Sequence, residues 1–175
     1  MKQNFIANDN PDTMNMKQSS ELVQVMNSLL AEVLADINQN MVHAEMCESW
    51  GYKKLQMAFR KQIMEKLNQS EWLIDRILFL KGTPRVSKLN TVVKLGKTVP
   101  DMIINANKVD GTSIKAYNNA IALAWKAKDQ GTVEILSRIL EMEEHLADWV
   151  RAQRVQMNQM GLENYLNNQT EAASN

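Results

Sequence analysis

Apolar residues recur every three or four positions through four long stretches of this 175-residue chain, which is the pattern of amphipathic α-helices. The pattern predicts long helices from about Ser19 or Ser20 to Trp50, Lys54 to Leu80, Thr98 to Lys128 and Gln130 to Gln159. A short polar helix is expected after Gly161. Twelve methionines against 6% aromatic residues favour helices packed by aliphatic side chains over a sheet protein.

The connection between the second and third helices, residues 83–97, is far longer than two antiparallel helices need. Gly82 and Pro84 cannot extend the second helix. A crossover of this length suits second and third helices that run parallel. The sequence therefore predicts an all-α fold, a left-handed four-helix bundle with a long crossover between helices two and three and a short C-terminal fifth helix. The third helix has a weak point, where it can kink, at residues 110–113.

The first helix has apolar residues on two of its faces. One stripe contains Leu22, Met26, Leu29, Val33 and Ile37, and the second contains Leu30, Leu34 and Met41. A helix that is apolar on two faces usually has two partners, one inside the bundle and one in another subunit. We therefore expect the chain to form at least a dimer.

Composition excludes several classes of function. Lys plus Arg equals Asp plus Glu at 20 each, so the net charge gives no reason to expect a nucleic-acid partner or an anionic membrane. Cys47 is the single cysteine, which excludes a disulfide framework and a cysteine-based zinc site. The only histidines are His43 and His145, which excludes a histidine-rich metal site.

The N-terminal segment is polar and lacks an apolar run, so it predicts neither a signal peptide nor a membrane span. We expect a flexible polar tail over residues 1–18, a bundle domain over residues 19–169 and a second flexible tail over residues 170–175. A cytoplasmic location is expected for such a chain.

Charged residues fall at mid-height on the inward stripes of three of the four helices. The second helix presents Lys66 with Gln69 one turn on, the third presents Asp110 and the fourth presents Glu143, whereas the first presents Val33. An isolated buried charge is costly, so charges at such positions are normally paired or bound to metal.

Several segments resemble bacterioferritin in their order and spacing. They are Ile37-Asn38-Gln39, His43-Ala44-Glu45-Met46, Trp50-Gly51, Arg76-Ile77-Leu78-Phe79-Leu80-Lys81-Gly82 and Met160-Gly161-Leu162-Glu163-Asn164-Tyr165-Leu166. The resemblance covers about residues 20–168. It implies a ferritin-like bundle that assembles into a hollow 24-subunit cage and stores iron as a mineral.

The resemblance also implies where a di-iron centre would lie. Such a centre needs a Glu from each of two helices and a Glu-x-x-His pair from each of the other two, and no Glu-x-x-His occurs in this chain. Matched to the family, the six ligand positions hold Val33, Lys66, Gln69, Asp110, Glu143 and Leu146. Glu143 keeps a family ligand and Asp110 is a shortened one, so we assign no catalytic residue.

Lys66 admits two interpretations. In the first, its ammonium replaces the metals by pairing with Asp110 and Glu143, as a lysine salt bridge does in the inactive site of ferritin light chains. In the second, Lys66 snorkels to a cavity and the acids are solvated. A slip of one residue in register would instead bring Glu32 and Glu65 inward, because it rotates a side chain by ~100°.

The methionine that would hold haem between two bacterioferritin subunits falls on Leu67, so the resemblance does not support axial haem ligation. Met64 and Met57 are alternative thioethers, although methionines in such a chain are more often packing residues. His43 is expected on a helix surface or at a subunit contact, and Cys47 as a small buried filler.

We therefore predict a bacterioferritin-like iron-storage cage subunit without ferroxidase activity of its own, with an active bacterioferritin subunit as a possible cage partner. Two alternatives remain open. One is an active ferroxidase with rearranged ligands, and the other is a structural or interaction bundle outside iron metabolism.

Overall fold

The computed structural model describes residues 11–86, 95–106 and 111–170, with the backbone alone for residues 11–18. Most of the described residues are helical and none of them lies in a strand, which confirms the all-α prediction. The helices are α1 (Pro11–Ser49), α2 (Lys53–Phe79), α3 (Val99–Ala106), α4 (Thr112–Lys126), α5 (Gln130–Met160) and α6 (Leu162–Asn167).

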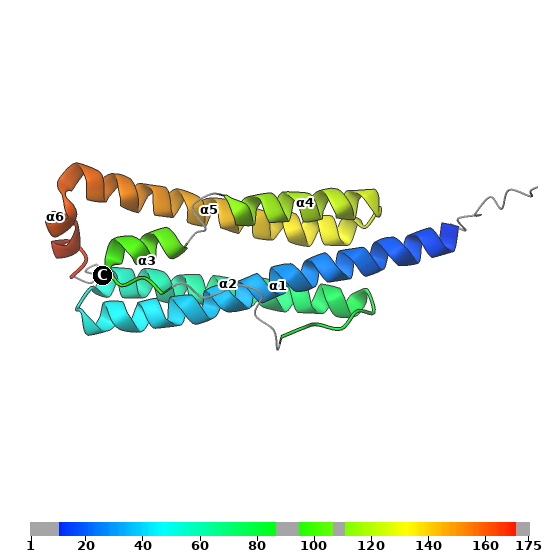
Figure 1. The fold of residues 1–175 in the computed structure, drawn as a ribbon, viewed down its shortest axis with the longest axis horizontal. Helices are drawn as coiled ribbons and strands as arrows, with labels where there is room; N and C mark the ends of the chain where they lie inside the picture. Colours follow the sequence, from blue (N-terminus) through cyan, green and yellow to red (C-terminus); the bar gives the residue numbers. More distant parts are fainter. Residues whose placement is uncertain (1–10, 87–94, 107–110, 171–175) are drawn as a thin grey trace, which may run out of the picture.

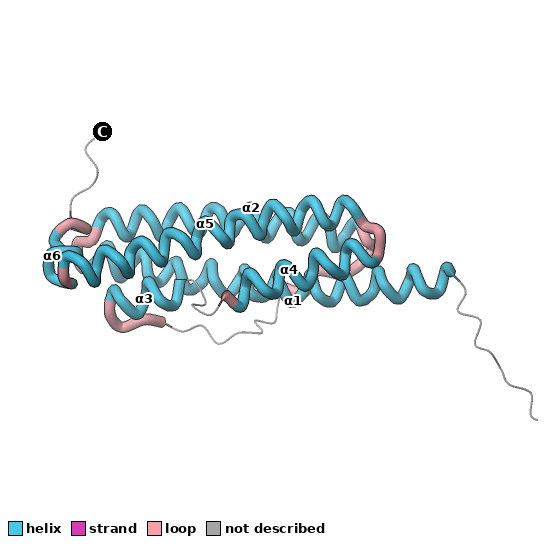
Figure 2. Tube along the Cα trace, turned by 90° about the horizontal axis from the view of Figure 1, so that it is seen from above, coloured by secondary structure: helices cyan, strands magenta, loops and turns pink. Residues whose placement is uncertain are grey.

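The helices form an elongated bundle (Figure 1). The hairpin of α1 and α2 lies along one side, and α5 lies along the other with α3 and α4. The short α3 is near the end of the bundle where α6 folds across, and α4 is near the opposite end (Figures 1 and 2). The first turns of α1 project beyond the bundle. None of the helices in the described part of the chain has the length and apolarity that crossing a membrane requires.

Two predicted boundaries are wrong. Helix α1 begins at Pro11, eight or nine residues before the predicted start at Ser19 or Ser20. Proline suits the first position of a helix, where its missing N–H has no intrahelical acceptor in any case. The predicted third helix is two helices, α3 and α4, and Gly111 takes a left-handed conformation (φ 68°) at the start of α4.

The crossover after α2 is anchored to α1 where it begins. The amide of buried Asn27 donates to the carbonyl of Thr83 (3.1 Å) and accepts from the backbone N–H of Arg85 (2.6 Å). A Cβ atom on Gly82 would lie 2.5 Å from a methyl carbon of Val23. Glycine therefore lets the chain leave α2 in direct contact with α1.

Arg76 joins the end of α2 to the start of α5. Its Nε donates to the hydroxyl of Thr132 (2.8 Å), its guanidinium pairs with Asp129, and it stacks 4.3 Å from the ring centre of Phe79. Partial burial tends to raise the pKa of Asp129, but hydrogen bonds from Thr132 and the charge of Arg76 outweigh it and lower that pKa.

Two apolar clusters fill the bundle, one toward each end. Met26, Leu73 and Leu136 belong to the cluster at the α4 end, and Phe59 and Ile103 belong to the cluster at the α6 end. Buried polar residues lie between the two clusters along α1, α2 and α5: Asn40, Gln62, Lys66, Gln69 and Glu143. This polar layer at mid-height contains the candidate site.

Candidate functional site

Lys66 lies at the centre of the polar layer and is only 3% exposed. Its ammonium nitrogen is 2.6 Å from a carboxylate oxygen of Glu143 on α5 and 3.1 Å from one of Asp36 on α1. Glu143 is equally buried, and its same oxygen accepts a hydrogen bond from the amide of Gln69 (3.1 Å). One cation thus links α1, α2 and α5 inside the bundle.

Electrostatics keep this lysine charged. Burial alone favours the neutral amine and would lower the pKa of Lys66, but the charges of Glu143 and Asp36 outweigh burial and raise it above its ordinary value. Burial, followed by the charge of Glu143, raises the pKa of nearby Tyr117, so its hydroxyl stays neutral. The site is therefore an ion pair beside a neutral phenol at physiological pH.

The structure brings together some of the residues that the sequence singled out. Lys66, Gln69 and Glu143 meet, whereas Asp110 lies outside the described residues and its role stays a prediction. Sequence reasoning missed Asp36. It stands three residues after the inward Val33, on the same side of α1, and that helical spacing was the available signal.

The residues at this level do not fit a pair of iron ions. Val33 lies within the apolar cluster, and Leu146 packs against the cluster at the α6 end. Both side chains are hydrocarbons, so neither offers a lone pair to a metal. The ammonium of Lys66 repels cations from the carboxylates it holds. Within the described residues, no three His, Cys, Asp or Glu side chains are placed to hold one metal ion.

Of the two carboxylates that a slip in register would bring inward, one lies at the surface and the other lies near Tyr117. Glu65 is at the surface, where its carboxylate is 3.6 Å from the ammonium of Lys61. Glu32 is half-buried, and its charge acts on Tyr117 from one turn before Asp36.

Comparison with known proteins identifies the fold family. Residues 23–160 match the family described as the ferritin-like domain. This chain belongs to the ferritin-like family. It is 34% identical over 155 residues to the bacterial ferritin of Pseudomonas aeruginosa. This alignment covers 88% of this chain and 99% of that protein.

Two further relatives show the same extent of match. The bacterial ferritin of Synechocystis is 30% identical over 88% of this ferritin-like chain and 99% of its own length. The bacterioferritin of Mycobacterium avium is 26% identical over 86% of this chain and 94% of its own. The resemblance read from the sequence is therefore confirmed along most of the chain.

The three residues considered for haem binding in this ferritin-like chain lie on the outer face of α2. Leu67 is 39% exposed, and its side chain has no lone pair for an axial bond. Met64 and Met57 are exposed on the same helix and carry thioethers. The residue at the family position thus does not fit haem iron.

His43 is completely buried, so the expectation of a surface position is wrong. The crossover covers it: the backbone N–H of Gly96 donates to its Nε2 (3.3 Å), and its ring meets the edge of Phe59 at 5.3 Å between ring centres. Burial lowers the pKa of His43 to about 4, so its ring is neutral. Cys47 is buried as expected, and burial raises its pKa to about 11.

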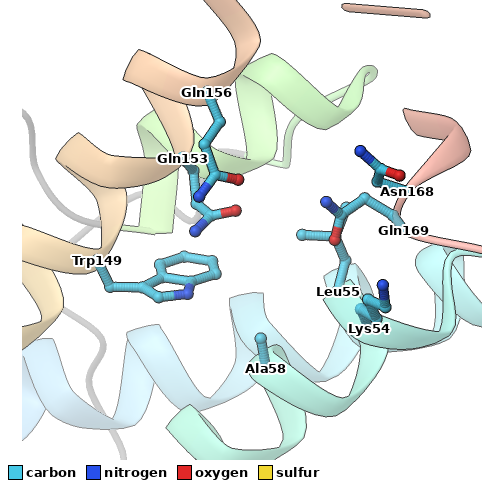
Figure 3. A pocket seen from close by; sticks show the side chains of 8 residues that line it. All are labelled: Lys54, Leu55, Ala58, Trp149, Gln153, Gln156, Asn168 and Gln169. Carbon is cyan, nitrogen blue, oxygen red and sulfur yellow. The ribbon is translucent and has the colours of Figure 1, made fainter. Parts of the chain in front are cut away.

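A separate polar pocket lies at the α6 end of the bundle (Figure 3). It has a volume of about 400 Å³ and lies between α2, α5 and the residues after α6. Its walls consist of Lys54, Leu55, Ala58, Trp149, Gln153, Gln156, Asn168 and Gln169. These eight residues include no carboxylate, imidazole or thiolate, so the pocket does not offer the usual ligands of iron.

Proposed function

We propose that this ferritin-like chain is an iron-storage cage subunit without a di-iron oxidation centre of its own. The observation that carries the proposal is the ammonium of Lys66, held between Glu143 and Asp36 at mid-height in the bundle. The relatives named bacterial ferritin and bacterioferritin support the storage role.

The proposed replacement follows from charge. A buried carboxylate such as Glu143 needs a positive partner, whether that partner is a metal ion or a basic side chain. The lysine supplies one charge without a cofactor and blocks the approach of a second cation. The amide of Gln69 donates a further hydrogen bond to Glu143. We expect the subunit to hold its bundle together in the absence of iron.

Self-association is part of the proposal. Met41 and Val42 are exposed on α1, and together with Glu45, Met46 and Ser49 they line a shallow surface pocket whose walls are mostly apolar. On α2, Met57, Met64 and Leu67 are exposed. Apolar surfaces of this kind suit contacts between subunits. We propose a 24-subunit cage, or at least a dimer, in the cytoplasm, either of this chain alone or mixed with an active bacterioferritin subunit.

The rate of ferrous iron oxidation in air tests the central claim. We expect the purified protein to oxidise Fe(II) no faster than a blank without protein. A fast phase that saturates at about two irons per subunit would contradict the proposal, because it would require a working di-iron centre. Sedimentation velocity of the same sample tests the cage separately, so the two claims can fail independently.

A gain-of-function variant sharpens this test. Lys66→Glu with Gln69→His would restore Glu-x-x-His on α2, and Leu146→His would restore it on α5 with Glu143. Adding Val33→Glu would supply the ligand of α1. We expect rapid Fe(II) oxidation to appear in this variant. The matched control is Asn68→His, which adds a histidine to the exposed face of α2 and should stay inactive.

A further inference from the structure

The polar pocket at the α6 end is built from three separate parts of the chain. Figure 3 shows the amides of Gln153 and Gln156 on one side of the hollow and those of Asn168 and Gln169 on the other. Lys54, from the first turn of α2, completes the polar lining. Burial differs among them: Gln169 is 8% exposed, whereas Lys54, Gln156 and Asn168 are open to solvent.

We propose that this pocket binds a small oxyanion, a phosphate or carboxylate group. The proposal is independent of the site at Lys66. Four side-chain amides and the ammonium of Lys54 line the hollow, and the NH₂ group of an amide and an ammonium are both hydrogen-bond donors. Donors of this kind, beside a positive charge and away from carboxylates, are what an oxyanion requires.

Two hydrogen bonds hold the walls in place before any ligand arrives. The hydroxyl of buried Tyr165 donates to the side-chain oxygen of Gln153 (2.7 Å), which leaves the NH₂ group of Gln153 free to donate. The backbone N–H of Lys54 donates to the carbonyl of Gln169 (3.1 Å), which joins the start of α2 to the turn after α6. A preformed pocket spends less free energy on ordering its groups when it binds.

The charge of Lys54 is available to a ligand, unlike that of its neighbour. Lys53 lies 3.1 Å from the carboxylate of Glu48 and is thus already paired. The eight described residues that line the pocket include no acid, so the field inside it comes from Lys54 and the amide dipoles. The two adjacent lysines therefore form a matched pair for an experiment.

The test is isothermal titration of the full-length protein with inorganic phosphate, acetate and glucose at fixed ionic strength. We expect saturable binding of phosphate or acetate at about one site per chain, and no binding of glucose. The preferred anion would distinguish a phosphate site from a carboxylate site. Equal binding of glucose, or no saturable binding of either anion at roughly millimolar concentration, would overturn the proposal.

Variants locate the site. Lys54→Gln should weaken anion binding about tenfold, because it removes the charge that assists the hydrogen bond. Lys53→Gln, which alters the neighbouring lysine outside the pocket, should leave affinity unchanged. Tyr165→Phe frees the amide of Gln153 to turn its oxygen inward and should weaken binding by a few fold. Equal loss in Lys53→Gln and Lys54→Gln would mean a general charge effect and would contradict the assignment.

Discussion

Lys66 and His43 are both basic side chains buried in the same bundle, yet their charges differ. Lys66 has two carboxylates within 3.1 Å, and its pKa lies above its ordinary value. His43 has a backbone N–H and an aromatic ring for neighbours, and its pKa falls to about 4. Burial favours the neutral form of both. The side chains that face each base therefore decide whether it is a cation.

The same difference separates the roles we assign to the two regions. We propose that the buried cation takes the place of metal ions because it offsets the charge of Glu143, the family ligand that this chain keeps. A neutral ring that accepts a hydrogen bond from the crossover instead helps to cover the core at the α6 end. Variants that remove either base should show these roles as different losses of stability.

Lys66→Ala should have the largest effect, a loss of ~3–5 kcal/mol in the free energy of unfolding, because Glu143 and Asp36 lose their shared cation. Urea denaturation at one fixed protein concentration measures it, since self-association adds to apparent stability. The double variant Lys66→Met with Glu143→Gln should recover much of the loss. A loss below ~1 kcal/mol in Lys66→Ala would contradict the assignment of Lys66 as a buried cation that its two carboxylates need.

The raised pKa of Lys66 predicts that the stability of the fold depends on pH in the alkaline range. Because its pKa is raised in the folded state, its stabilisation is fully present below its ordinary pKa of 10.5 and should be lost only as pH rises beyond that value.

His43 should make the protein sensitive to acid. Its folded pKa of about 4 lies below its ordinary 6.5, so the unfolded chain binds the proton first and stability falls as pH drops between these values. The full contribution is about 3 kcal/mol. Urea denaturation at pH 7 and pH 4 should show a smaller pH-dependent loss for His43→Leu than for the unaltered protein. Equal losses would mean that His43 takes up its proton in the folded state.

Arg76→Ala tests an ion pair of intermediate burial. Arg76 and Asp129 are each 15% exposed, and the guanidinium also bonds Thr132. We expect a loss of ~1.5–3 kcal/mol, because hydrogen bonds between charged groups are removed in a partly solvated place. Thermal unfolding beside Lys66→Ala gives the ranking. A larger loss for Arg76→Ala would mean that burial does not set the order.

Lys61→Ala should have the smallest effect, at most ~0.5 kcal/mol, because its side chain is 78% exposed and its pair with Glu65 is solvated. The same denaturation experiment measures it. A loss comparable with that of Lys66→Ala would show that the two lysines do not differ in the way their surroundings indicate.

Parts of the site could be read from the sequence, and others could not. Helical spacing placed Lys66, Gln69 and Glu143 on inward stripes, and the structure brings them into contact. Asp36 was missed because the stripe through Val33 was followed at one position per turn, while the ammonium of Lys66 reaches a residue beside that stripe. The length of a lysine side chain makes such contacts hard to assign from spacing alone.

The sequence by itself determined the order of the helices, because apolar spacing and turn residues act locally, and its motifs identified the family. It did not determine that the predicted third helix is the two helices α3 and α4. Tertiary structure alone decided which carboxylates meet Lys66, that the crossover contacts the buried His43, and that the residues after α6 close a polar pocket against α2 and α5. Each of these depends on segments far apart in the chain. Their contacts follow from how the helices pack, and this packing cannot be inferred from local sequence patterns.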